Sequence, residues 1–249
     1  PGRSNALVFA LIGVLIAVSA EQLRRYPNPS ARTFREAAAR VHGVDPEQIL
    51  AFNGGDELLA SAVRACAGEG QKVAFLEPSY SLYPVLTEMQ GARATRVDYQ
   101  LSDGGWQLPA GLARVDARLL LVVNPNAPTG HLNPIAALDE IAGSFGGVML
   151  IDEAYVNFAG ENALSLVNKH ENVLLLRTLS KGYSLAGLRF GYALGSRGLL
   201  RESEKVRDSY PCDAVSIAAS AAAMEAQAYA RGTWKKVIAE RTRLSGELR

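Results

Sequence analysis

The sequence predicts an α/β protein: a three-layer α/β/α domain whose mostly parallel sheet lies between two layers of helices. From about Tyr26 onward, amphipathic helical stretches alternate with short apolar runs rich in Val, Leu and Ile. This alternation is typical of strands joined by helical crossovers. Most runs are continuously apolar, as expected of strands buried on both faces. A chain of 249 residues that is 48% hydrophobic can bury such a core.

The first predicted helix follows Ser30, which is a candidate helix cap. Its apolar residues from Phe34 to Val41 recur at helical spacing, and Gly43 can end it. A second helix is expected directly after Gly55 and Asp56. Both helices precede the first apolar run that we assign to the sheet.

Later elements follow the same logic. Asn133 and Pro134 predict a helix cap with proline at the first helical position. The Ala-rich segment from Asp213 to the end predicts two more helices. The predicted strands are residues 72–76, 93–97, 119–123, 148–152, 173–176 and 190–194.

Charge and cysteine content limit the classes of function. The formal net charge is +1, and basic and acidic residues are balanced along the chain, which argues against a nucleic-acid-binding protein and favours small-molecule partners. Cys66 and Cys212 are far apart and form no CxxC pair, so neither a zinc site nor a disulfide framework is indicated. A reducing compartment, and hence a cytoplasmic location, fits this cysteine usage.

The amino-terminal residues form an apolar run at residues 6–18. The run is shorter than the roughly 20 residues that a membrane-spanning helix needs. Arg3 before it and the small residues after it are compatible with a secretory signal. A buried or fragmentary leading segment is the alternative interpretation, and nothing downstream indicates a membrane protein.

The segment from Leu176 to Gly191, L-R-T-L-S-K-G-Y-S-L-A-G-L-R-F-G, collects polar groups behind a predicted strand. Thr178, Ser180 and Arg189 supply hydroxyl and guanidinium donors that suit a phosphate. A lysine among apolar neighbours, as expected for Lys181, loses affinity for its proton and becomes a nucleophile toward an aldehyde. Taken alone, the Ser-Lys pair is more typical of a surface lysine.

The segment V-M-L-I-D-E-A-Y places Asp152 at the carboxyl end of a buried strand. A carboxylate there is costly to bury without a partner. That end of the strands faces the ligand crevice in open α/β sheets, so a cationic heterocycle is a candidate partner. Capping of a following helix is the alternative role for Asp152.

Two further segments carry groups that can bind an anion or a flat ring. In N-G-G-D-E, the backbone amides near Gly55 and Asp56 make a ready anion site at a helix start, although a plain cap has the same pattern. In E-P-S-Y-S-L-Y-P, the ring of Tyr80 can stack on a flat heterocycle. Tyr83 is the less suitable stacker, and a core position with a bonded hydroxyl is compatible with either tyrosine.

The string S-K-x-x-x-L-A-G-L-R-x-G at residues 180–191 resembles the cofactor-lysine segment of the fold-type I, pyridoxal-phosphate-dependent aminotransferases. Among these, it is most similar to the histidinol-phosphate aminotransferases. The resemblance implies that Lys181 holds pyridoxal 5'-phosphate as a Schiff base and is the catalytic residue. It further implies that Asp152 faces the pyridine nitrogen, that Tyr155 bonds the ring hydroxyl and that the phosphate is bound by Gly55, Asp56, Thr178, Ser180 and Arg189.

Two positions fit this family less well. In N-P-N-A-P-T-G at residues 124–130, Ala127 stands where the family has an asparagine that contacts the ring hydroxyl. Either Asn126 replaces it or the contact is missing. In R-Y-P, Tyr26 resembles a tyrosine that reaches the cofactor phosphate of a neighbouring subunit, which implies a homodimer; a packing role for Tyr26 is equally compatible.

The resemblance implies three regions: an atypical amino-terminal arm at residues 1–26, a cofactor-binding large domain at residues 27–205 and the start of a small domain at residues 206–249. The chain stops within a predicted helix, so most of the small domain is expected to be absent. The implied reaction converts histidinol phosphate and 2-oxoglutarate to imidazole-acetol phosphate and glutamate in histidine biosynthesis. The alternatives are an aromatic amino-acid aminotransferase, an enzyme similar to threonine-phosphate decarboxylase, or a catalytically incompetent cofactor-binding fragment.

Overall fold

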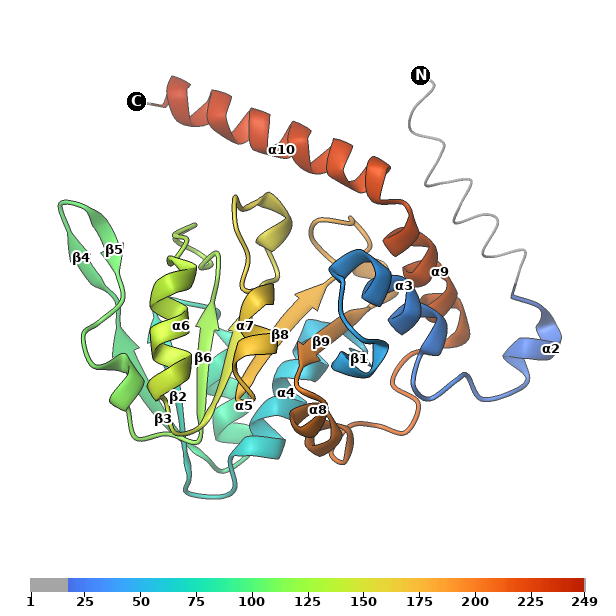
Figure 1. Cartoon of the computed structure of the whole chain (residues 1–249), viewed down its shortest axis with the longest axis horizontal. Helices are drawn as coiled ribbons and strands as arrows, with labels where there is room; N and C mark the ends of the chain where they lie inside the picture. The colour runs from blue at the N-terminus through green and yellow to red at the C-terminus, as the bar shows by residue number, and fades with distance from the viewer. Residues whose placement is uncertain (1–17, 249) are drawn as a thin grey trace.

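The computed structural model describes residues 18–248 and centres on a seven-stranded sheet (Figure 1). The strand order is β1-β9-β8-β7-β6-β2-β3. Within the described residues, β9 alone runs antiparallel to its neighbours β8 and β1, and the other pairs are parallel. The strands are β1 (Ile49–Phe52), β2 (Lys72–Glu77), β3 (Arg93–Asp98), β6 (Leu119–Val123), β7 (Val148–Asp152), β8 (Val173–Thr178) and β9 (Gly191–Gly195), with a separate hairpin of β4 (Gln100–Ser102) and β5 (Gly105–Gln107).

The sheet is covered by helices on both faces, so its central strands are apolar except near the carboxyl ends of β7 and β8, which carry Asp152, Arg177 and Thr178. In β6, Leu119, Leu121 and Val123 pack into one hydrophobic core, whereas Leu120 and Val122 pack into the other. This alternation follows from the period of two along a strand. Every residue of β6, β8 and β9 is buried. The predicted fold class is therefore confirmed.

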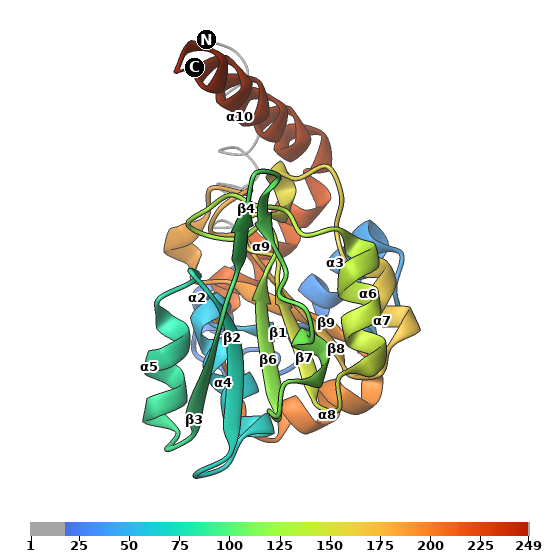
Figure 2. The same ribbon diagram turned by 90° about the vertical axis from the view of Figure 1, so that its left-hand side faces the viewer.

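The helices divide into two layers (Figure 2). One layer contains α4 (Gly54–Cys66), α5 (Leu82–Met89) and α8 (Arg197–Glu204). The opposite layer contains α3 (Arg32–His42), α6 (Ile135–Ser144), α7 (Leu164–Lys169) and α9 (Ala214–Glu225), with α9 packed against α3. The remaining helical elements are α2 (Ala20–Leu23), α10 (Gln227–Glu247), and the 3-10 turns η1 (Pro46–Gln48), η2 (Leu112–Arg114), η3 (Val156–Phe158) and η4 (Ala186–Leu188).

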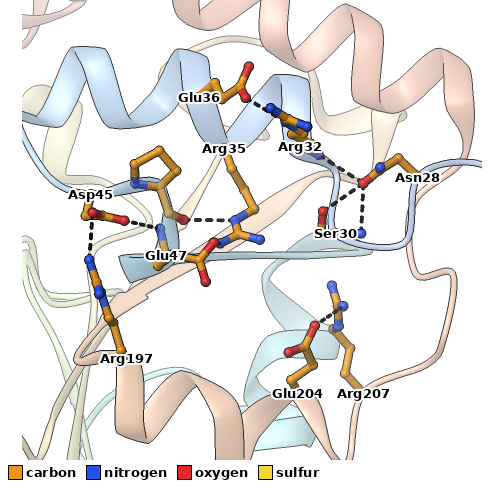
Figure 3. A network of polar contacts seen from close by, with 11 residues as sticks. Asn28, Ser30, Arg32, Arg35, Glu36, Asp45, Glu47, Arg197, Glu204 and Arg207 are labelled. Atoms are coloured by element: carbon orange, nitrogen blue, oxygen red, sulfur yellow. Dashed lines mark hydrogen bonds and ion pairs between the residues drawn. The ribbon is translucent and has the colours of Figure 1, made fainter.

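Polar contacts connect the turn that leads into β1 to two helices, α3 and α8 (Figure 3). Arg35 donates to the carbonyl of Pro46 at 2.8 Å and pairs with Glu47 at 2.8 Å. Arg197 at the start of α8 pairs with Asp45 at 2.7 Å. Because the carboxylates of these pairs are largely exposed, the pairs contribute little stability. They lie away from the ends of β7 and β8, where the candidate site is found.

The long helix α10 extends beyond the sheet on the side where β8 ends (Figure 1). Ala230 is its only buried residue. The indole of Trp234 donates to the carbonyl of Gly182 at 2.6 Å, which connects α10 to the loop after β8. No helix among residues 18–248 is long and apolar enough to cross a membrane. The predicted domain boundaries at residues 26 and 205 stay predictions.

Two of the predicted helix starts are wrong. Ser30 does not cap α3; its backbone N–H and hydroxyl both donate to the Asn28 side chain, and Ala31 in a left-handed conformation precedes the helix. Asn133 does not cap α6, because Pro134 is the capping residue and Asn133 is buried against Asn124. The end of α3 at a left-handed Gly43 is as predicted.

The strand predictions were nearly complete. All six predicted strands are present within two residues of their expected ends. The short strand β1 and the β4-β5 hairpin were missed. The apolar run at residues 6–18 lies outside the described residues except for Val18.

Candidate active site

A cavity of about 200 Å³ lies at the carboxyl ends of β6, β7 and β8. Its walls come from the start of α4, the loop before α5, the residues after β7 and the loop between β8 and β9. This position is where open parallel sheets bind ligands. Nine of the sequence-predicted site residues line it: Gly55, Asp56, Tyr80, Asp152, Tyr155, Thr178, Ser180, Lys181 and Arg189.

One end of the cavity is rich in hydrogen-bond donors. Thr178 is the last residue of β8, and its hydroxyl lies 3.0 Å from that of Ser180. The Thr178 hydroxyl also contacts the carbonyl of Phe190 at 3.2 Å, which fixes the loop against the start of β9. Arg189 and the first turn of α4 complete this end, so hydroxyls, a guanidinium and helix-start amides converge as a phosphate requires.

Arg189 reaches this position through an unusual backbone. It adopts a left-handed conformation with φ of 50°, which turns the chain between η4 and β9. Its Nη2 lies 3.5 Å from Asp56 Oδ2. Gly54 is required opposite, because a Cβ there would lie 2.7 Å from Arg189 Nη2 and the φ of Gly54 is +86°. The sequence interpretation emphasised Gly55 and missed Gly54.

The other end of the cavity contains the buried carboxylate of Asp152, which is 4% exposed. The backbone N–H of Ala154 donates to Oδ1 at 3.0 Å, and the hydroxyl of Tyr83 donates to Oδ2 at 3.0 Å. Burial raises the pKa of Asp152 to about 6 in spite of these two hydrogen bonds. A cationic ring nitrogen in the cavity would favour the ionised form, so the site suits a positively charged heterocycle.

Lys181, Tyr155 and Tyr80 also line the cavity. Lys181 is exposed rather than enclosed by apolar neighbours, so that part of the sequence interpretation is wrong. Its Nζ lies 5.3 Å from the centroid of the Tyr155 ring. The hydroxyl of Tyr80 donates to Asp56 Oδ1 at 3.2 Å, which holds its aromatic ring beside the cavity.

Two sequence-predicted residues do not line this cavity. The Nδ2 of Asn126 donates to the carbonyl of Pro78 and to the hydroxyl of Thr129, both at 2.9 Å. Asn126 therefore stabilises the turn, and Ala127 lines the cavity instead. Tyr26 is 80% exposed and stacks on Tyr210 at 4.5 Å between ring centroids.

Behind the cavity, on the opposite face of the sheet, Glu153 and Arg177 form a buried ion pair at 2.7 Å. They are the immediate neighbours of Asp152 and Thr178, so strand alternation directs their side chains away from the cavity. His42 and Asn162 contact the same guanidinium, each at 3.2 Å. The sequence interpretation missed this network, although a Glu after Asp152 and an Arg before Thr178 were visible signals.

Comparison with known proteins agrees with this site. Residues 6–249 match the family described as aminotransferase class I and II. This chain belongs to that family. The match includes much of the amino-terminal run that the sequence analysis treated as atypical. Histidinol-phosphate aminotransferase 1 of Trichormus variabilis is 44% identical over 241 residues, covering 96% of this aminotransferase chain and 68% of the relative.

Other relatives point the same way. The histidinol-phosphate aminotransferase of Geotalea uraniireducens is 43% identical over 239 residues and is also covered to 68%. The crystal structure of histidinol-phosphate aminotransferase from Sinorhizobium meliloti in complex with pyridoxal-5'-phosphate has a TM-score of 0.85 and 28% identity; the match covers 94% of this aminotransferase chain and 65% of that structure. The chain thus spans about two thirds of the length of these relatives.

The side chains present fit pyridoxal phosphate, the cofactor of this aminotransferase family. Donors for a dianion lie at one end of the cavity, and a buried carboxylate for a ring nitrogen lies at the other. An aromatic ring and an amine line the same cavity, as an aldehyde-bearing heterocycle requires. That Tyr155 contacts the ring hydroxyl stays a prediction.

Proposed function

We propose that this chain binds pyridoxal phosphate covalently through Lys181 and catalyses the transamination of histidinol phosphate with 2-oxoglutarate. The observation that carries the proposal is that Lys181, Asp152 and Arg189 line a single cavity. One nucleophile, one ring-nitrogen partner and one phosphate partner are the minimum set for this cofactor. The sequence relatives named above support the choice of substrate.

When bound, pyridoxal phosphate supplies an aldehyde for the amino group and a ring that accepts the electrons of the substrate carbanion. The Asp152 carboxylate stabilises positive charge at the ring nitrogen. Arg189, with Thr178 and Ser180, binds the phosphate and thereby sets the ring's position. The amine of Lys181, once freed by the amino donor, would move the proton from the substrate carbon to the cofactor carbon, acting first as general base and then as general acid.

A cytoplasmic homodimer is the form that we propose for the working enzyme. Tyr26 is exposed on the arm before α3, as a residue that reaches a second subunit would be. The two cysteines, Cys66 and Cys212, are free. Both observations support the proposal, and a measured molecular mass of the purified chain would test the dimer.

One observation favours a second candidate function, in which the chain binds the cofactor but does not turn over substrate. The chain spans only about two thirds of the length of its relatives. Cofactor binding and turnover must therefore be measured separately.

The test uses the purified chain with added pyridoxal phosphate. We expect a visible absorbance band that persists after gel filtration, is removed by borohydride, and is absent in Lys181→Ala. Formation of glutamate from histidinol phosphate and 2-oxoglutarate would support the aminotransferase. The absorbance band without turnover of histidinol phosphate or an aromatic amino acid would favour the second candidate, and no band in the parent chain would contradict both.

A further inference from the structure

The carboxylate of Asp152 is held from behind by a tyrosine that does not line the cavity. Tyr83 lies in the first turn of α5, and its hydroxyl donates to Asp152 Oδ2 at 3.0 Å. Its side chain is 0% exposed. Since Ala154 N–H donates to the other oxygen, Oδ1, both carboxylate oxygens have a fixed donor. The plane of the carboxylate is therefore set before any ligand enters.

We propose that Tyr83 is a positioning residue that orients the Asp152 carboxylate and keeps it ionised for the ring nitrogen of the cofactor. This inference rests on the proposed function, because it names how the same site recognises its pyridine ring. Tyr83 acts through Asp152 and makes no contact with the cavity itself. Its role differs from that of Tyr80, which lines the cavity.

The position of the Tyr83 hydroxyl is fixed by core packing. The ring lies 6.1 Å from that of Phe75 and 5.8 Å from that of Tyr80, measured between centroids. The Tyr83 backbone carbonyl accepts a hydrogen bond from Thr87 within α5. A side chain enclosed in this way loses little further conformational freedom when it donates to Asp152, so the hydrogen bond is preorganised.

The groups around Asp152 raise and lower its pKa, and this hydrogen bond is one of those that lower it. Burial raises the pKa of Asp152, and the carboxylates of Asp56 on α4 and Glu153 at the end of β7 raise it further. The hydrogen bonds from Ala154 and Tyr83 lower it. Lys181 lines the same cavity, and Arg177 beyond Glu153 is paired with that carboxylate. Removal of the Tyr83 hydroxyl would take away one of the two hydrogen bonds that lower the pKa of Asp152. The pKa would therefore rise, and the carboxyl would take up a proton at higher pH.

The test is the dissociation constant of pyridoxal phosphate, measured from pH 5 to pH 9 for the parent and for Tyr83→Phe. We expect binding by the parent to weaken as the pH falls through about 6. The Tyr83→Phe curve should shift to higher pH by about one unit, as loss of a hydrogen bond to a charged group predicts, so that binding is about twofold weaker than in the parent at pH 7 and about tenfold weaker at pH 5. The contribution of Lys181 is common to both proteins.

Tyr99→Phe is the matched control, because Tyr99 is also a buried tyrosine whose hydroxyl is bonded, in this case to Asn133. Its curve should superimpose on the parent curve. If Tyr83→Phe also superimposes, the positioning role is overturned while the proposed function stands. If the parent fails to bind pyridoxal phosphate at any pH, the proposed function is overturned, and this role with it.

A double-mutant cycle separates positioning from general packing. In an Asp152→Asn background the residue that Tyr83 acts on no longer titrates. We therefore expect Tyr83→Phe to produce no further shift of the pH curve in that background. A shift of equal size in both backgrounds would show that Tyr83 acts by another route and would overturn the inference.

Discussion

At the scale of single residues, the site depends on side chains whose positions are set by their backbone. Arg189 is the clearest case, because a non-glycine residue in the left-handed region is uncommon and is maintained only by surrounding structure. Its guanidinium approaches Gly54 closely, so a Cβ there would displace it. Arg189 therefore lines the cavity while its side chain stays about half exposed.

We expect Arg189→Ala to raise the dissociation constant of pyridoxal phosphate by roughly 10- to 100-fold, because a guanidinium bond to phosphate is charge-assisted. Equilibrium dialysis would measure the change. Arg197→Ala is the control, since Arg197 pairs with Asp45 on the surface away from the cavity. Equal dissociation constants for Arg189→Ala and the control would contradict the phosphate assignment.

Asp152→Asn tests the charge at the ring nitrogen with almost no change in shape. We expect the variant to fold and to bind the cofactor more weakly, and at saturating cofactor to transaminate about 100- to 1,000-fold more slowly, as the loss of one electrostatic partner of the transition state predicts. The measurement is the rate per bound cofactor. Asp116→Asn, which removes only an exposed partner of Lys72, should keep the parent rate. A near-parent rate in Asp152→Asn would refute the role.

At the scale of secondary-structure elements, a buried polar network joins the layers behind the site. Glu153 follows β7, Arg177 lies in β8 and His42 ends α3. The Nε2 of His42 contacts the hydroxyl of Tyr192 in β9 at 2.8 Å. The network thereby connects α3, β7, β8 and β9, and two of its members are the chain neighbours of Asp152 and Thr178. Because the ion pair is fully enclosed, removing one partner would leave a buried charge.

This network predicts how stability depends on pH. Burial, with the nearby Arg177 guanidinium, lowers the pKa of His42 to about 3. The folded state thus prefers the neutral imidazole, and the unfolded state takes up the proton near pH 6.5. The stabilisation is present above pH 6.5 and is lost as the pH falls from there toward 3. Between pH 7 and pH 5 the loss is roughly 2 kcal/mol.

The measurement is the free energy of unfolding by urea at both pH values, for the parent and for His42→Gln. Other groups, including Asp152, titrate in both proteins and cancel in the comparison. The parent should lose roughly 2 kcal/mol more than His42→Gln on acidification. Parallel losses would show that His42 is not held neutral by the fold.

The strands that could be predicted from the sequence have long apolar runs, and the missed strands do not. The buried strands β6, β7 and β8 are predictable because both of their faces are covered, which requires a largely apolar run. Strand β1 is only four residues long, and its pairing with β9 depends on a partner about 140 positions away. Ser30 does not cap α3 because its hydroxyl donates to Asn28, and Asn133 does not cap α6 because its side chain is buried, where its Nδ2 donates to Tyr99 and Asn124.

The same distinction applies to the site. Lys181, Asp152 and Arg189 lie in contiguous motifs, so the sequence alone located them. Tyr83 and Asp152 are 69 residues apart, and only the packing of α5 on the sheet brings the hydroxyl to the carboxylate. For Asn126, the motif predicted two possible roles. In the structure its side-chain amide donates to the carbonyl of Pro78 and the hydroxyl of Thr129 within the turn, which could not be foreseen from the sequence.

At the scale of the whole molecule, the cofactor would connect parts of the chain that are distant in sequence. The cavity wall includes the start of α4, the end of β7 and the loop after β8. A ligand that contacts all three binds the folded chain and not the unfolded chain, so it must raise stability by mass action. The size of the gain in stability therefore depends on how many of the predicted site residues contact the ligand.

At a pyridoxal phosphate concentration about 100 times its dissociation constant, the stabilisation should be about 2.7 kcal/mol. For a chain of 249 residues this corresponds to an increase in Tm of about 5–10 °C. Pyridoxal, which lacks the phosphate, should raise Tm less at the same concentration because Arg189, Thr178 and Ser180 remain without an anion. Lys181→Ala should also reduce the increase, because the covalent link is lost while the phosphate contacts remain. Equal shifts with pyridoxal and pyridoxal phosphate would mean that the donors around Arg189 do not bind phosphate, and the orientation that we propose for the cofactor would then be wrong.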